Sequence, residues 1–203
     1  MPRPSASDDT DLHREYLQTF VAFNINIYHA FATHPKILVV GLNGPAVGMS
    51  AAIVAHADFI YCTPHTFLLT PFSSLGLVAE GGSSRALVQR LGIAKANEAL
   101  IMSRRIPAPE LERCGFVSAI FETGAGEDGK FRDMVLDEVN ERFGEHLVMD
   151  SLIEIKRLIR KPELDTLHQQ NVCEAFAGLE RFVKGIPQEE FRKIARGEKR
   201  HKL

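Results

Sequence analysis

The chain has 203 residues, with 24 basic and 26 acidic side chains and a formal net charge of −2. This balance gives no electrostatic reason to expect a nucleic-acid partner, and no apolar run approaches the roughly 20 residues that a membrane-spanning helix needs. Three cysteines (Cys62, Cys114 and Cys173) without a paired spacing favour a reducing compartment over a disulfide scaffold. With 45% hydrophobic residues, we expect one large globular domain, or a domain with an appendage.

In chain order, the pattern predicts short strands alternating with helices and then a helical tail. Residues 1–10 are expected to be a flexible lead, and helical spacing of apolar residues predicts a helix from 11 to about 32. Further elements are expected as strands at 36–42, 58–62, 66–69 and 115–121, and as helices at 51–57, from about 83, and at 94–102 and 107–113. Beyond a glycine-rich loop, helices are expected at about 130–144, 149–160, 163–183 and 188–197. The order predicts an α/β core over 11–123 and a helical region over 124–203.

Residues 43–50, N-G-P-A-V-G-M-S, form a glycine-containing turn between an expected strand and an expected helix. Backbone N–H groups in the first turn of a helix lack internal partners and lie at its positive end, so an anion or a developing oxyanion can bind there. Gly48 would let the backbone approach a ligand closely. A closely packed strand-to-helix turn explains the same glycines, and both interpretations stay open.

Residues 75–84, L-G-L-V-A-E-G-G-S-S, place one carboxylate, Glu80, at the end of an apolar run. Desolvation by the neighbouring Leu77 and Val78 should raise the pKa of this carboxyl, and a raised pKa suits a general base that takes a proton and hands it on. The alternative is an ordinary glutamate in the first turn of a helix, where the helix dipole favours it.

Other residues carry weaker signals. The eight histidines show no H-E-x-x-H or Cys/His ligand spacing, so we expect no metal site. His56, among alanines, is expected to be a packed core histidine, and Ser83 is expected to cap a helix or line a pocket. The basic helix edge at 156–161 is expected to be simply solvated.

Two stretches together resemble a known family. Residues 34–62 resemble the central signature of the crotonase (enoyl-CoA hydratase/isomerase) superfamily, and residues 69–84 resemble the second segment of peroxisomal Δ3,Δ2-enoyl-CoA isomerases. The similarity runs from about Tyr16 to the C-terminus. The A-E-G-G-S-S element is fairly specific within the superfamily, whereas N-G-P-A-x-G marks the superfamily only. The resemblance implies an α/β fold, a crotonase-like ββα spiral core (N-terminally truncated) with a C-terminal α-helical subdomain.

The resemblance also implies a chemistry. The substrate would be an acyl-CoA thioester, and no separate cofactor is expected because coenzyme A is part of the substrate. Glu80 would remove the C2 proton of a 3-enoyl chain and return a proton at C4, while the Met49 N–H would be one oxyanion donor. Residues expected to bind substrate are Asn24, Ala46, Gly48, Phe72 and Leu75, with Asn24 as an orienting or water-holding residue.

The resemblance bears on rival activities as well. The two acids that hydratases use fall at Ala52 and Pro71, which cannot transfer protons, so a hydratase of the usual mechanism is disfavoured. The S-G-x-D-like turn that supplies the other oxyanion N–H is absent, and losing one such donor costs about 10²–10³ in rate. A truncated, non-catalytic or weakly active acyl-CoA-binding subunit is therefore an alternative. Another is a crotonase of peroxisomal secondary metabolism.

The last three residues resemble a targeting signal. His201, Lys202 and Leu203 differ at the first position only from the S-K-L type tripeptide that peroxisomal import receptors read. A solvated basic tail is the alternative. By family resemblance, the helical region over 124–203 is expected to support a homo-oligomer, either a trimer or a hexamer.

Overall fold

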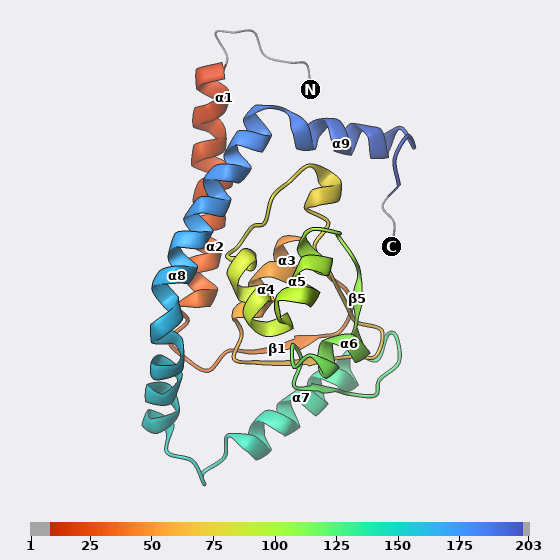
Figure 1. Ribbon diagram of the computed structural model, residues 1–203. Coiled ribbons are helices and arrows are strands. Elements are labelled where there is room, and N and C mark those ends of the chain that lie inside the picture. The colour runs from red at the N-terminus through yellow and green to blue at the C-terminus, as the bar shows by residue number, and fades with distance from the viewer. Residues whose placement is uncertain (1–8, 201–203) are drawn as a thin grey trace.

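Helices from opposite ends of the sequence lie side by side along one flank of the molecule (Figure 1). In the computed structural model, which describes residues 9–200, α1 (Asp9–Tyr16), a π-helical turn η1 (Leu17–Val21) and α2 (Ala22–Ala32) pack against α8 (Met149–Val183). Their contact is closed by a small apolar cluster of Val21, Ala175 and Leu179. The long N-terminal helix is thus confirmed, although it begins at Asp9 and contains a π-turn. The rest of the expected flexible lead, residues 1–8, lies outside the described residues.

Short strands form two three-stranded sheets within the described part of the chain. The first has the order β1-β3-β6 and is parallel; it contains β1 (Val39–Leu42), β3 (Phe59–Cys62) and β6 (Ala119–Ile120). The second has the order β2-β4-β5; it contains β2 (Ala46–Val47), β4 (Phe67–Leu69) and β5 (Ile106–Pro107), with β2 and β4 parallel and β4 and β5 antiparallel. The strand expected over 115–121 is reduced to the two residues of β6.

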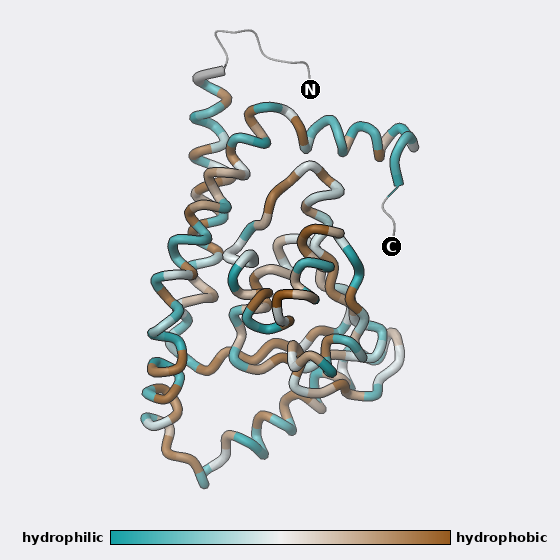
Figure 2. Tube along the Cα trace, viewed as in Figure 1, coloured by the Kyte–Doolittle hydropathy of each residue, from teal (hydrophilic) through white to brown (hydrophobic). Residues whose placement is uncertain are grey.

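Short helices pack on these sheets and complete the core. They are α3 (Met49–Ile53), the 3-10 turn η2 (Val54–His56), α4 (Ser83–Leu91), α5 (Ile93–Leu100) and α6 (Ala108–Arg113). Ala51 and Ala52 on α3 and Ala96 and Ala99 on α5 are fully buried, and this small side chain lets the helices approach closely. Larger core side chains such as Ile60, Leu68, Leu87 and Phe116 are fully buried, each contributing roughly 1.5–3 kcal/mol by burial. Figure 2 shows hydrophobic residues gathered in this centre, whereas the outer helices alternate between hydrophilic and hydrophobic residues.

The C-terminal helices enclose this core. They are α7 (Asp128–Arg142), α8 and α9 (Ile186–Ala195). The expected division of 149–183 into two helices is wrong, because α8 continues through Pro162. Proline removes one backbone hydrogen bond of a helix, but ion pairs on both sides of it hold α8 in place: Arg160 pairs with Asp58, and Glu163 with Arg85. The division into a core over 11–123 and a separate helical region over 124–203 stays a prediction.

The basic edge of α8 is not simply solvated. Lys156 Nζ lies 2.7 Å from Asp58 Oδ2, and Arg160 lies 2.9 Å from Asp58 Oδ1 while also donating to backbone carbonyls just before β3. Burial raises the pKa of Asp58, but hydrogen bonds from the Leu38 N–H, Lys156 and Arg160 outweigh it, so that the pKa is lowered overall. These contacts fix α8 to the parallel sheet. Within residues 9–200, no helix combines the length and apolarity needed to cross a membrane.

The proline inside α8 yields a stability prediction. Pro162→Ala restores a backbone N–H in mid-helix and should raise the free energy of unfolding by up to about 3 kcal/mol, measured by urea denaturation. Pro187→Ala is the matched control, because Pro187 lies in the first turn of α9, where no helical hydrogen bond needs its N–H. A Pro162→Ala protein no more stable than the parent would show that the proline costs α8 nothing and would contradict this prediction.

Candidate active site

Two loops that follow neighbouring parallel strands meet at one edge of the second sheet. β2 is followed by Gly48 and Met49, and β4 is followed by the segment that reaches Phe72. Ala46 is paired in register with Leu68, and the Gly48 N–H donates to the Leu69 carbonyl at 2.8 Å, so the two strands run together to their carboxyl ends. The structure therefore brings the predicted site residues Ala46, Gly48, Met49 and Phe72 into one region.

Met49 begins α3, with Gly48 as its N-cap. The N–H of a first helical residue has no partner within the helix and lies at the positive end of the helix dipole. Gly48 has φ +63°, which glycine adopts readily, and a Cβ placed on it would meet nothing within 4 Å. Close packing thus does not explain this glycine. Its backbone conformation does, and the space beside Gly48 itself is open.

Glu80 is buried, with 8% of its surface exposed. The helix that follows, α4, starts only at Ser83, with Gly82 as its N-cap, so Glu80 is not a first-turn helix glutamate. Burial, and to a smaller extent the negative charge of Glu174, raise the pKa of the Glu80 carboxyl to about 7. The sequence-based expectation of a raised pKa is confirmed, while the catalytic role of Glu80 stays a prediction.

The turn that carries Glu80 is held by side chains from elsewhere in the fold. The Gly81 N–H donates to Asn24 Oδ1 at 3.3 Å, and His56 Nε2 donates to the Gly81 carbonyl at 2.8 Å. His56 is buried and its pKa is lowered to about 4 by burial, so the ring is neutral. As predicted, it is a packed core histidine. Asn24, predicted to orient substrate or water, is placed with its oxygen on the turn; its contact with substrate stays a prediction.

The same turn lies directly against α3. A Cβ on Gly81 would lie 2.9 Å from Met49 Sδ and 3.3 Å from the Ala52 Cβ, so only glycine fits there. Glu80 and the Met49 N–H are therefore on touching segments. Ala52 and Pro71 are both buried and carry no acid, so neither position supplies a further carboxylate beside Glu80.

The remaining predicted substrate residue, Leu75, ends the 3-10 turn η3 (Ser73–Leu75) and is half-buried. α9 packs over this turn, and a Cβ on Gly76 would lie 2.7 Å from Ile186 at the start of α9. Arg181 of α8 donates to the Gly76 carbonyl at 2.8 Å. The C-terminal helices thus cover the segment that carries Phe72 and Leu75.

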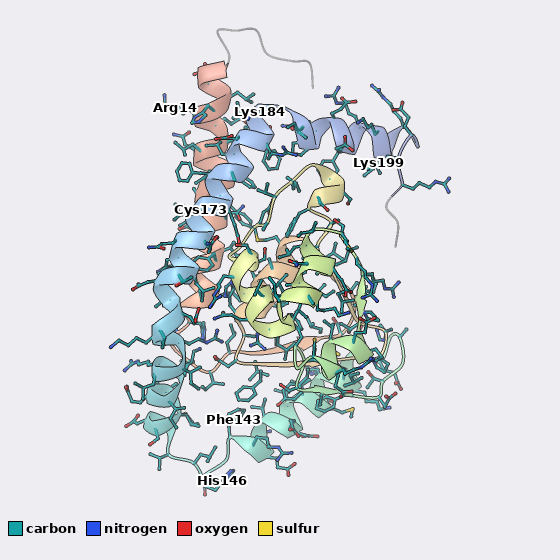
Figure 3. All side chains as sticks on the ribbon, in the orientation of Figure 1. Arg14, Phe143, His146, Cys173, Lys184 and Lys199 are labelled. Carbon is teal, nitrogen blue, oxygen red and sulfur yellow. The ribbon has the colours of Figure 1, made fainter. Side chains whose placement is uncertain are left out.

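Sequence reasoning missed one buried group at the site, Glu174 on α8. Its two carboxylate oxygens accept hydrogen bonds from the Gly82 and Ser84 N–H groups, each at 2.7 Å. Figure 3 labels Cys173, the preceding residue on α8. Ser83, expected as a cap or pocket residue, instead receives the Glu80 N–H on its hydroxyl at 3.3 Å. No local motif marked Glu174, because its partners lie about 90 residues earlier.

Curated relatives match most of this chain in sequence. A "Delta(3,5)-Delta(2,4)-dienoyl-CoA isomerase" of Pyricularia oryzae is 62% identical over 100% of this chain and 75% of its own length. A "3,2-trans-enoyl-CoA isomerase" of Saccharomyces cerevisiae is 31% identical over 97% of this chain and 71% of its own length. An "Enoyl-CoA delta isomerase 3, peroxisomal" of Mus musculus is 29% identical over 92% of this chain and 52% of its own length.

The fold has solved counterparts as well. The crystal structure of an enoyl-CoA hydratase/isomerase from Pseudoalteromonas atlantica matches with a TM-score of 0.77 and 26% identity, over 87% of this chain and 68% of that one. This agreement confirms the predicted crotonase-like α/β fold with its C-terminal helices. The model of the enoyl-CoA hydratase/isomerase family matches residues 11–129, more than half of the sequence. The chain belongs to the enoyl-CoA hydratase/isomerase family.

Proposed function

We propose that this chain is an enoyl-CoA isomerase that moves a carbon–carbon double bond of an unsaturated acyl-CoA, in fatty acid oxidation, through the carboxylate of Glu80. The observation that carries the proposal is a buried acid with a pKa raised to about 7, on a turn that touches the start of α3. The two isomerase relatives that cover nearly the whole chain support the same activity.

The proposed reaction needs one base and one oxyanion donor. The Glu80 carboxylate takes a proton from C2 of a 3-enoyl-CoA, and the electrons move onto the thioester oxygen, which the Met49 N–H stabilises. The Glu80 carboxylic acid then returns the proton at C4 while the double bond shifts from C3–C4 to C2–C3. No water, oxidant or separate cofactor enters. A pKa near 7 suits this reversible transfer, because the group both takes and gives its proton near neutral pH.

A second substrate is favoured by the 62% identical relative, whose name specifies a 3,5-dienoyl-CoA. The first step would be identical, with loss of the C2 proton to Glu80, but the proton would return at C6 and both double bonds would shift. The two substrates share the buried base and differ only in how far along the chain the proton is returned. Assays with each substrate decide between them.

The activity prediction concerns Glu80. Purified protein should convert 3-enoyl-CoA to 2-enoyl-CoA, or 3,5-dienoyl-CoA to 2,4-dienoyl-CoA, and the change in ultraviolet absorbance measures the rate. Glu80→Gln should lower kcat by about 10²–10⁴-fold because the base is lost. Since the carboxylate is the active form, kcat/KM should rise with pH and level off above about 7.

Glu163→Gln is the matched control, because it removes a carboxylate from α8 that pairs with the Arg85 side chain and not with the backbone of the turn. Turnover that survives Glu80→Gln unchanged would rule out the proposed base. Acyl-CoA binding without turnover in the unmodified protein would favour the alternative of a non-catalytic subunit.

We further propose that the protein forms a homo-oligomer, a trimer or a hexamer, through the first half of α8. Apolar side chains gather there and at the N-cap of the helix, and those more than half exposed are Val148, Met149, Ile155, Leu158 and Ile159. A cavity of about 390 Å³ opens beside them, lined in part by Leu152, Ile155 and Ile159. An apolar surface of this kind is typical of a contact between protein subunits.

The oligomer prediction is tested by light scattering coupled to size exclusion. Leu158→Glu should reduce the molar mass to that of a smaller assembly, because a charge cannot be buried unpaired in the contact. Val172→Glu, at an exposed position in the second half of α8, is the control and should leave the mass unchanged. A monomeric parent protein, or an unchanged mass for Leu158→Glu, would refute this interface.

A peroxisomal location, with import through a receptor for the tripeptide His201-Lys202-Leu203, is also proposed. These three residues lie outside the described residues, so the support is their similarity to the S-K-L signal and the relative named as peroxisomal. A fluorescent protein fused to the N-terminus should give punctate signal that coincides with a peroxisomal marker. The same fusion without Leu203 should be diffuse, and diffuse signal from both would refute the proposal.

A further inference from the structure

Glu174 is a buried acid that the proposed proton transfer does not use. It lies on α8 and is 6% exposed. Oε2 accepts the Gly82 N–H and Oε1 accepts the Ser84 N–H, so each oxygen binds one of the backbone groups at the start of α4. Two oxygens that both accept hydrogen bonds are the arrangement of an ionised carboxylate.

Among the residues that the structure describes, the partners of Glu174 are hydrogen-bond donors and none is a cation. Arg85, on the same helix α4, pairs with Glu163 instead. Burial raises the pKa of Glu174 overall, although the hydrogen bonds from Ser84, Gly82 and Ser83 lower it in part. The first turn of α4 also favours a negative charge, because its free N–H groups lie at the positive end of the helix dipole. The carboxylate of Glu174 is therefore held in place by hydrogen bonds from backbone N–H groups.

We propose that Glu174 is a positioning residue for Glu80: its carboxylate fixes the turn that follows Glu80 and places a second buried negative charge beside that base. The inference rests on the proposed function, since it assigns Glu174 a role in the same proton transfer. It concerns a residue of the C-terminal helical region, whose partners lie about 90 residues earlier.

The geometric part follows from how the turn is held. Three side chains bind its backbone from three elements: Asn24 from α2, His56 from η2 and Glu174 from α8. Asn24 is an amide and His56 is neutral, so Glu174 is the charged member of the three. Moving it shifts the Gly82 N–H, two residues from the base.

The electrostatic part follows from which groups share this space. The charge of Glu174 raises the pKa of Glu80 in addition to burial, and it likewise raises the pKa of Tyr28, for which burial is the larger cause. The Tyr28 hydroxyl lies 3.0 Å from His168 Nδ1. The cations Arg90 and Arg160 act on the buried His56 instead. A like charge beside Glu80 favours its protonated form, so Glu174 holds the base near the pH at which it can both take and return a proton.

The decisive experiment compares pH profiles of kcat/KM. Glu174→Gln keeps the shape of the side chain but removes the charge, so the pH at which activity rises should move down by on the order of one unit. Because Gln offers only one acceptor oxygen, kcat should also fall, by roughly tenfold to a hundredfold. Glu163→Gln, the control on the same helix, should change neither value.

Glu174→Asp separates the effect of the charge from the effect of the side-chain length. It retains the charge but is one methylene shorter, so the profile should keep its midpoint near pH 7 while kcat falls. If Glu174 merely stabilised the fold, both substitutions would lower kcat without moving the midpoint of either pH profile. An unshifted midpoint in Glu174→Gln would overturn the proposal. If that variant does not fold, Glu174→Asp at full rate would overturn it instead.

A measurement without turnover distinguishes this proposal from the proposed function. The folded pKa of Glu80, about 7, lies above its ordinary value of 4.5, so the folded state binds the extra proton and Glu80 destabilises the protein progressively as pH rises through this window. The stability gained by Glu80→Gln should therefore grow from pH 4.5 and level off near 7. When Glu80→Gln is introduced into a protein that already carries Glu174→Gln, this gain in stability should level off at lower pH. If this plateau moves to lower pH but the unmodified protein shows no isomerase activity, the effect of Glu174 on Glu80 stands and the proposed isomerase function is refuted. If the plateau does not move, the proposed effect of Glu174 on Glu80 is refuted.

Discussion

Burying one carboxylate without a cation is the constraint on which the site depends. Moving an acid out of water costs free energy unless it is paired or neutralised, and Glu80 meets this cost by a pKa raised to about 7. The proton affinity that makes the residue costly to ionise is the property that a reversible base needs. The surroundings must therefore exclude water while adding no positive charge.

The turn after Glu80 shows how the fold satisfies that demand. Gly81 and Gly82 both have positive φ, and a Cβ on either would lie 2.9 Å from a neighbouring side chain, Met49 on one side and Tyr28 on the other. The two glycines thus let the turn pack closely against the core, and this packing excludes solvent from the turn. Its backbone donors and acceptors are then satisfied by uncharged groups and by a second anion, none of which neutralises Glu80.

Local pattern was enough to predict much of this arrangement. The strands β1, β3 and β4, the glycine turn before α3 and the raised pKa of Glu80 were all predicted, because each depends on about ten consecutive residues. The continuous α8 and the contacts of Glu174 and Arg160 were not, because they depend on partners far away in sequence. At Pro162 the local rule for helix breaking is overridden by ion pairs on either side of it.

His56 and Glu80 give the turn opposite responses to pH. His56 has its pKa lowered from 6.5 to about 4, so the unfolded chain binds more protons and stability rises with pH across that range. Glu80 has its pKa raised from 4.5 to about 7, so stability falls with pH across nearly the same range. Each shift corresponds to about 3 kcal/mol, and between pH 4.5 and 6.5 the two offset one another. A neutral histidine that donates to Gly81 thus lets the fold keep an unpaired buried acid without making its stability steeply dependent on pH.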